Sequence, residues 1–242
     1  MGESWQPVPK SIHDWVPAPG SVVSWHASPK SRAKAQAAPI SAVPASYMQA
    51  QHLRGYYRYA AQGRDYSRLP ISSWDIPGQC DIRAMTYVIN AHLRRHETYR
   101  SWFECKDGEP IVRRTMPNPR DIQFVPVEYG ELSPADFRNH LLATPDPSEW
   151  DCFTFGLIQR ADHFTFYVCV DHLHTDVTFM GVVFMEIHAM YHTLVSGGAP
   201  LQLPPAGSYD DFWHDRRFAA RISTECHESL SLSGHPPSAL CR

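Results

Sequence analysis

The sequence predicts an α/β fold, and three observations lead to this prediction. Two apolar runs, 152–158 and 164–170, alternate large side chains with small or polar ones. This alternation is typical of β-strands, in which successive side chains point to opposite faces of the sheet. The short polar break between them indicates a hairpin. At 178–194, apolar residues recur at the i, i+3, i+4 and i+7 spacing of a helix. Strands and helices that share one chain in this way are typical of a sheet covered by helices.

Three further helices and five further strands follow from local signals. Ser46, Asp81 and Ser133 each stand where a helix-capping side chain is expected, and Gly63 stands where the first of these helices would end. The Asp81 helix is expected to end near residue 95 or 96. An Asp-Gly pair within 106–109 favours a hairpin turn. Strands are predicted at 21–25, 68–74, 102–105, 111–115 and 122–127.

Composition divides the chain into three parts. Residues 1–45 are rich in Pro, Ser and Ala, which predicts an extended leader packed on the domain. Residues 46–218 carry the regular patterns and form the domain. Residues 219–242 are Ser-rich and show neither period, so we expect a disordered tail.

The overall composition narrows the class of protein. At 242 residues the chain is long enough for a large core, and a net charge of -3 gives no electrostatic reason to bind nucleic acid. The sequence contains no apolar run of membrane-spanning length and no signal-peptide pattern. Its six cysteines have no metal-type spacing. We therefore expect a cytoplasmic protein with reduced thiols and no transmembrane segment.

The candidate catalytic residues lie in the stretch Asp171-His172-Leu173-His174-Thr175-Asp176, between a predicted strand and a predicted helix. A histidine held there is suited to act as a general base. A neutral His172 would take the proton of an acceptor hydroxyl or amine as it attacks a thioester, and would return it to the departing thiol. Asp176 would fix the shape of the loop through an arginine. The sequence does not identify the donor to the oxyanion.

This stretch is similar to the HHxxxDG motif of the acyltransferases related to chloramphenicol acetyltransferase, which include condensation domains of peptide synthetases. The run Arg95-His96-Glu97-Thr98-Tyr99-Arg100 resembles their RHExLR segment. Segments 45–52, 87–96 and 204–212 resemble the mycobacterial polyketide-associated acyltransferases that esterify trehalose glycolipids. The resemblance covers about residues 12–218.

The resemblance implies a fold and an activity. The fold is one half of such an enzyme, a two-layer sandwich with a mixed sheet and helices on one face. The activity is that of an O-acyltransferase, which moves a fatty or polyketide acyl group from acyl-CoA or a carrier-protein thioester to a sugar hydroxyl of a trehalose glycolipid. His172 is the implied general base, and Asp176 is the structural carboxylate with Arg100 as its partner. No cofactor beyond the thioester donor is implied.

The resemblance also implies partners and a location. The partners are the acyl thioester donor, the glycolipid or sugar acceptor, and a polyketide synthase or a separate C-terminal half. The location is the cytoplasm or the inner face of the membrane.

The sequence departs from the family pattern in three ways. Asp171 replaces the first histidine of the motif. Val177 replaces the glycine after the aspartate, and a valine there would be strained if the position needs a positive φ. The chain also corresponds to the first of the two similar halves of this family. A catalytically inactive remnant or interaction domain is therefore the alternative to the enzyme.

Three other groups of residues have a functional and a structural interpretation. His172, His174 and Asp176 on one strand face, or His188 and His192 one helical turn apart, would suit a histidine metal-binding protein; a polar helix edge is the alternative for the second pair. Four aromatic residues either line an acyl chain's path or pack in the core: Trp102, Phe103, Trp150 and Trp213. Four arginines either bind a coenzyme A phosphate or are solvated: Arg94, Arg95, Arg113 and Arg114.

Overall fold

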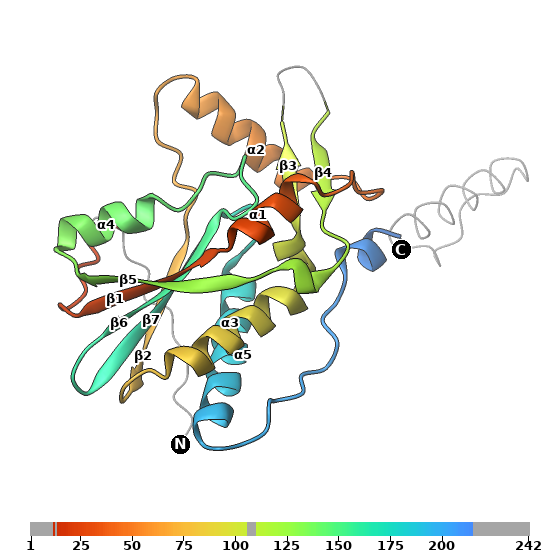
Figure 1. Ribbon diagram of the computed structural model, residues 1–242. Helices are drawn as coiled ribbons and strands as arrows, with labels where there is room; N and C mark the ends of the chain where they lie inside the picture. The colour runs from red at the N-terminus through yellow and green to blue at the C-terminus, as the bar shows by residue number, and fades with distance from the viewer. Residues whose placement is uncertain (1–11, 13, 106–109, 215–242) are drawn as a thin grey trace, which may run out of the picture.

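The computed structural model describes residue 12 and residues 14–105 and 110–214. Its main feature is a five-stranded sheet in the order β2-β7-β6-β1-β5 (Figure 1). The strands in that order are Ile71–Pro77, His163–Val170, Phe153–Gln159, Ser21–Ala27 and Phe124–Glu131. A separate hairpin joins β3, Ser101–Glu104, to β4, Val112–Thr115. The prediction of an α/β fold is confirmed.

Every neighbouring pair in the larger sheet is antiparallel, so the expected mixed sheet is wrong in this detail. The helix α4, Pro134–Leu142, connects β5 to β6, and this kind of connection normally joins parallel neighbours. Here β1 lies between those two strands and pairs antiparallel with both. The insertion of β1 removes the one parallel contact that the connection would have made.

The first 45 residues contribute more than a leader. β1 lies between β6 and β5, and its Trp25 is fully buried in the core. The segment also forms helix α1, Pro29–Gln36, where extended chain was expected. Ser28 caps this helix by accepting a hydrogen bond from the Ser31 N–H. Pro29 stands in the first turn, where proline favours a helix because that N–H has no intrahelical partner.

The helix starts predicted from capping residues are confirmed. α2 spans Tyr47–Ala60 behind Ser46, α3 spans Ile82–Arg95 behind Asp81, and α4 follows Ser133. Gly63 has a φ of 63°, which fits its role just beyond α2. α5 spans Val177–Val195. Two short 3₁₀ helices complete the described part, η1 at Glu97–Arg100 and η2 at Pro119–Asp121.

Helices cover both faces of the sheet, and the expectation of helices on one face is corrected. α3 and α5 lie side by side on one face (Figure 1) and pack on Trp25, Phe155, Phe166 and Val168. α4 packs on the other face, where its Phe137 and Leu141 contact a cluster containing Val22, Ile158, Tyr167 and Cys169. Since β7 carries large apolar side chains on both faces, both faces need cover from water.

Two expectations lie outside the described residues: the turn at 106–109 and the tail at 219–242. The two strands that flank the turn do pair as a hairpin. Within the part that the structure describes, none of the helices is long and apolar enough to cross a membrane.

Candidate active site

His172 lies in the turn between β7 and α5, as the sequence predicts. Backbone hydrogen bonds anchor this turn: the Asp171 N–H donates to the Cys152 carbonyl, and the His172 N–H donates to the Arg68 carbonyl at 2.8 Å. The His172 side chain is exposed, and its Nδ1 lies 2.8 Å from the carbonyl oxygen of Thr175. The backbone is therefore fixed while the ring is open to a substrate.

The contact with Thr175 decides which nitrogen of the His172 ring carries the proton. A carbonyl oxygen can only accept a hydrogen bond, so in neutral imidazole Nδ1 is the protonated nitrogen. Nε2 then has its lone pair free. This is the tautomer that a general base needs in order to take a proton from an acceptor.

Asp176 is exposed and caps α5. Its Oδ1 accepts a hydrogen bond from the Phe179 N–H at 2.7 Å, so this carboxylate holds the first turn of the helix. The expected pairing with Arg100 is wrong for the described residues. The Arg100 guanidinium instead donates to the Met116 carbonyl at 3.4 Å. A structural role for Asp176 fits the geometry, through the helix cap rather than through an arginine.

Val177 is the first residue of α5 and is 72% exposed. Among the described residues, those with positive φ are all glycines. The strain expected at Val177 is therefore absent, because the first position of a right-handed helix needs only a negative φ.

Asp171, which stands at the first histidine of the related motif, is the centre of a buried cluster that the sequence did not reveal. Its Oδ1 accepts from His52 Nε2 at 2.7 Å and from the Leu173 N–H, and its Oδ2 accepts from Arg68 at 2.9 Å. Burial raises the pKa of this carboxyl, but the hydrogen bonds from His52, Leu173 and Arg68 outweigh it and hold the pKa below its usual value.

The same cluster brings a second imidazole beside His172. The ring centroids of His52 and His172 are 6.1 Å apart, and the Tyr66 ring packs on His52 at 5.3 Å. Arg68 also donates to the carbonyls of Thr144 and Pro145. The turn is thus held from α2, from the segment before β2 and from the loop after α4. His52 does fall in segment 45–52, but sequence spacing could not place it against residue 171.

His174 points into the protein, unlike its neighbour His172. Its Nδ1 lies 3.1 Å from the Thr98 hydroxyl, and its buried Nε2 has no hydrogen-bond partner among the described residues. Burial lowers its pKa to about 4, so this ring is neutral at pH 7. The metal site expected from His172, His174 and Asp176 does not form in the described structure, because the outer two are exposed and His174 is buried.

The four arginines proposed as phosphate ligands are neither free nor simply solvated. Arg113 is buried, with its guanidinium 2.6 Å from Glu97 and 2.9 Å from Asp210. Glu97 is drawn to a pKa of about 2: burial acts to raise it, but hydrogen bonds from Ser208 and Arg113 outweigh that effect. The other three have partners of their own: Arg94 with the Ile122 carbonyl, Arg95 with Glu186, and Arg114 with Glu104.

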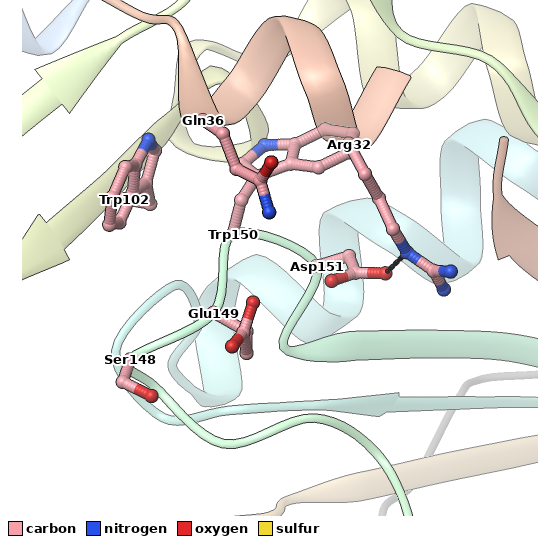
Figure 2. Close-up of a pocket in the computed structure, with 7 residues that line it drawn as sticks. All are labelled: Arg32, Gln36, Trp102, Ser148, Glu149, Trp150 and Asp151. Atoms are coloured by element: carbon pink, nitrogen blue, oxygen red, sulfur yellow. Dashed lines mark hydrogen bonds and ion pairs between the residues drawn. The ribbon is translucent and has the colours of Figure 1, made fainter. Parts of the chain in front are cut away.

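The aromatic residues mainly fill the core. Phe103 and Trp150 are buried, and the Trp102 indole donates to the Ala35 carbonyl. Trp102 and Trp150 do line a cavity of about 40 Å³, beside the ion pair of Arg32 and Asp151 (Figure 2). Ligand pockets usually have roughly 300 Å³ or more. This cavity suits water molecules and is too small for an acyl chain.

No model of a protein family matches the chain. Curated relatives do: acyltransferase PapA3 of Mycobacterium tuberculosis H37Rv is 58% identical over 181 residues, 74% of this chain and 38% of PapA3. Trehalose-2-sulfate acyltransferase PapA2 of Mycobacterium tuberculosis H37Ra is 57% identical over 166 residues, 69% of this chain and 35% of PapA2. Over its matched residues, this chain is similar to the polyketide-associated acyltransferase family.

Solved structures agree with this family. A PapA2 acyl transferase superposes with a TM-score of 0.82 at 54% identity, covering 88% of this chain and 46% of that chain. The starter condensation domain of a rhizomide synthetase superposes at 0.56 with 13% identity, covering 87% of this chain and 49% of that chain, which shows a shared fold alone. This chain thus has the condensation-type fold that the motif implied. It spans less than half the length of these relatives.

Proposed function

We propose that this chain carries the general base of an O-acyltransferase, and that the base is His172. The observation that carries the proposal is the hydrogen bond from Nδ1 to the Thr175 carbonyl, which leaves Nε2 basic on an exposed ring. The substrates follow from the relatives. PapA2 is named a trehalose-2-sulfate acyltransferase. PapA1 of Mycobacterium tuberculosis H37Ra is named a 2'-acyl-2-O-sulfo-trehalose (hydroxy)phthioceranyltransferase. It is 58% identical over 167 residues, which are 69% of this chain and 33% of PapA1.

The proposed reaction moves a fatty or polyketide acyl group from acyl-CoA or a carrier-protein thioester to a sugar hydroxyl of a trehalose glycolipid. His172 Nε2 takes the hydroxyl proton as the acceptor oxygen bonds to the thioester carbonyl carbon. The tetrahedral intermediate then breaks its C–S bond, and the departing sulfur takes the proton back from Nε2. The products are an ester and a free thiol, and no acyl-enzyme forms.

The surrounding residues hold the base in place. In the imidazolium that forms during the reaction, the Thr175 carbonyl continues to accept the Nδ1 proton. Asp176 holds the start of α5, and Asp171 ties the turn to α2 through His52. No cofactor beyond the thioester donor takes part in this scheme. The chain would work in the cytoplasm or at the inner face of the membrane, with a polyketide synthase or a separate C-terminal half as protein partner.

A second function, that of a non-catalytic interaction domain, is favoured by one feature. Val177 and Met185 on α5 are 72% and 69% exposed, and in this function they would be part of a surface that another protein covers. In this case the fold is retained and His172 has no catalytic role.

One experiment separates these functions. The purified chain is given a long-chain acyl-CoA and trehalose 2-sulfate, and ester formation is compared with that of His172→Ala. The matched control is His192→Ala, since His192 is an exposed histidine on α5. We expect the rate to be roughly 10²–10⁴-fold lower for His172→Ala and unchanged for the control. Equal rates in all three, or none in any, would favour the interaction domain.

A further inference from the structure

A cluster apart from the His172 turn joins α3 and α5, the two helices that cover one face of the sheet. His92 lies in the last turn of α3, His96 is the C-cap residue four positions later, and Glu186 faces both from α5. Nδ1 of His92 and Nε2 of His96 lie 2.9 Å and 2.8 Å from the same carboxylate oxygen, Oε2 of Glu186. Two imidazoles therefore converge on one oxygen atom, across the packed pair of helices.

These atoms match the donor set of a known class of metal site. Two histidines and one glutamate bind Zn²⁺ in proteins, with the fourth position left to water. The two rings lie side by side at the end of α3, with centroids 4.6 Å apart. Among the described residues, these three form the group of histidine and carboxylate ligands whose donor atoms all lie within 4.8 Å of one another.

The distances suit a site that opens slightly when an ion enters. With metal–ligand bonds of about 2.0–2.1 Å, tetrahedral ligand atoms lie roughly 3.4 Å apart. The two nitrogen–oxygen distances to Glu186 are about half an ångström shorter than that. Small rotations of the His96 and Glu186 side chains would make room for the ion, because these side chains keep 12% and 11% of their surface exposed.

We propose that His92 Nδ1, His96 Nε2 and Glu186 Oε2 bind one divalent metal ion of the zinc class, which joins α3 to α5. In the ion-free state the two N–H groups donate to the carboxylate. When the ion binds, the proton of each neutral imidazole lies on the nitrogen that does not bind the metal, Nε2 in His92 and Nδ1 in His96. For His92 that nitrogen lies 3.4 Å from the Tyr99 hydroxyl, which can accept it.

The residues around the cluster support metal binding and also limit the affinity for the ion. The Arg95 Nε donates to Glu186 Oε1 at 2.9 Å and so orients the carboxylate while Oε2 faces the histidines. Phe179 packs against both imidazoles, with ring centroids 6.2 Å and 5.1 Å away. The positive charge of Arg95 opposes a cation, so we expect reversible binding rather than a permanently held ion.

The test uses the full chain with ZnCl₂ in isothermal titration calorimetry, and CoCl₂ as a spectroscopic probe of tetrahedral coordination. His96→Gln and Glu186→Gln each remove one ligand at a partly exposed position, so the fold is retained, and circular dichroism verifies this. The matched control is the double variant His188→Gln and His192→Gln. That pair has the same helical spacing, with rings stacked at 6.4 Å, but it is not part of a three-ligand group in the described structure.

We expect one equivalent of Zn²⁺ to bind to the wild type and to the control, and to raise the Tm of both. Binding to His96→Gln and Glu186→Gln should be at least about 100-fold weaker, since loss of an outer-sphere partner alone costs 10–100-fold. The proposal is overturned if the wild type binds no zinc. It is equally overturned if both ligand variants bind as the wild type does, because the three side chains are then only a hydrogen-bonded link between helices.

Discussion

The buried carboxylate of Asp171 accepts a hydrogen bond from His52, which lies 119 residues earlier in the chain. Asp171 occupies the first histidine position of the related motif. The acid draws in an imidazole from α2, so a second ring still lies beside His172. The turn that carries His172 is therefore held by a residue from a distant element.

Loss of the Asp171 charge should destabilise the whole domain. Asp171→Asn leaves Arg68 and His52 facing a neutral amide in a buried place, and breaking such an interaction typically costs about 3–5 kcal/mol. Because asparagine retains some hydrogen bonds, we expect a loss of roughly 2–4 kcal/mol in the free energy of unfolding, measured by urea denaturation. Asp162→Asn, at an exposed carboxylate, should change it by less than about 0.5 kcal/mol. Equal urea midpoints for both variants would contradict this.

Stability should fall in mild acid because of His174. Its pKa is about 4 in the folded protein, against an ordinary value of 6.5 for a solvated histidine, so between these values the unfolded chain binds the proton and the folded chain does not. The contribution of the neutral His174 ring to the free energy of unfolding is complete above pH 6.5. It is lost as the pH falls towards 4, and the loss is up to roughly 3 kcal/mol.

Unfolding free energy measured from pH 7 to pH 4 should therefore decline less steeply in His174→Asn than in the wild type. His192→Asn serves as the control, and its curve should match the wild type. Parallel slopes for His174→Asn and the wild type would show that the buried ring does not contribute. The Asp171 carboxyl, whose folded pKa is lowered, acts in a separate window and loses its contribution as the pH falls below 3.8.

The role of Asp176 can be separated from catalysis by two substitutions. Asp176→Ala removes the cap of α5 and should cost about 1 kcal/mol of stability. Asp176→Asn keeps a capping oxygen, so both stability and acyl transfer should stay near the wild-type level. A large loss of activity in Asp176→Asn, with stability unchanged, would show that the negative charge itself acts in the reaction.

Val177→Gly tests whether the missing glycine of the motif matters to the backbone. Since Val177 has ordinary helical geometry, glycine should relieve no strain and should destabilise α5 by about 0.5–1 kcal/mol through its greater freedom in the unfolded chain. Thermal unfolding of this variant beside Val177→Ala gives the comparison. A higher Tm for the glycine variant than for the alanine variant would reveal strain at this position.

Local signals in the sequence determined most of the elements. Ser46, Asp81 and Ser133 marked three helix starts, and alternation marked the β6–β7 hairpin. They also placed His172 between β7 and α5. These features depend on hydrogen bonds and periodicities within a few residues, which the order of amino acids displays directly. The helix at Pro29–Gln36 departs from the expected extended chain, because proline disfavours the interior of a helix but is favourable in its first turn.

Only the tertiary structure decided how distant segments meet. It placed β1 between β5 and β6, set Asp171 against His52 and Arg68, and brought Glu186 from α5 to His92 and His96. Each of these contacts joins residues far apart in the chain, and they form because burying both faces of the sheet brings those segments together. The amino-acid sequence thus determined the place of His172 and its turn, while packing decided which groups hold that turn and which histidines share a carboxylate.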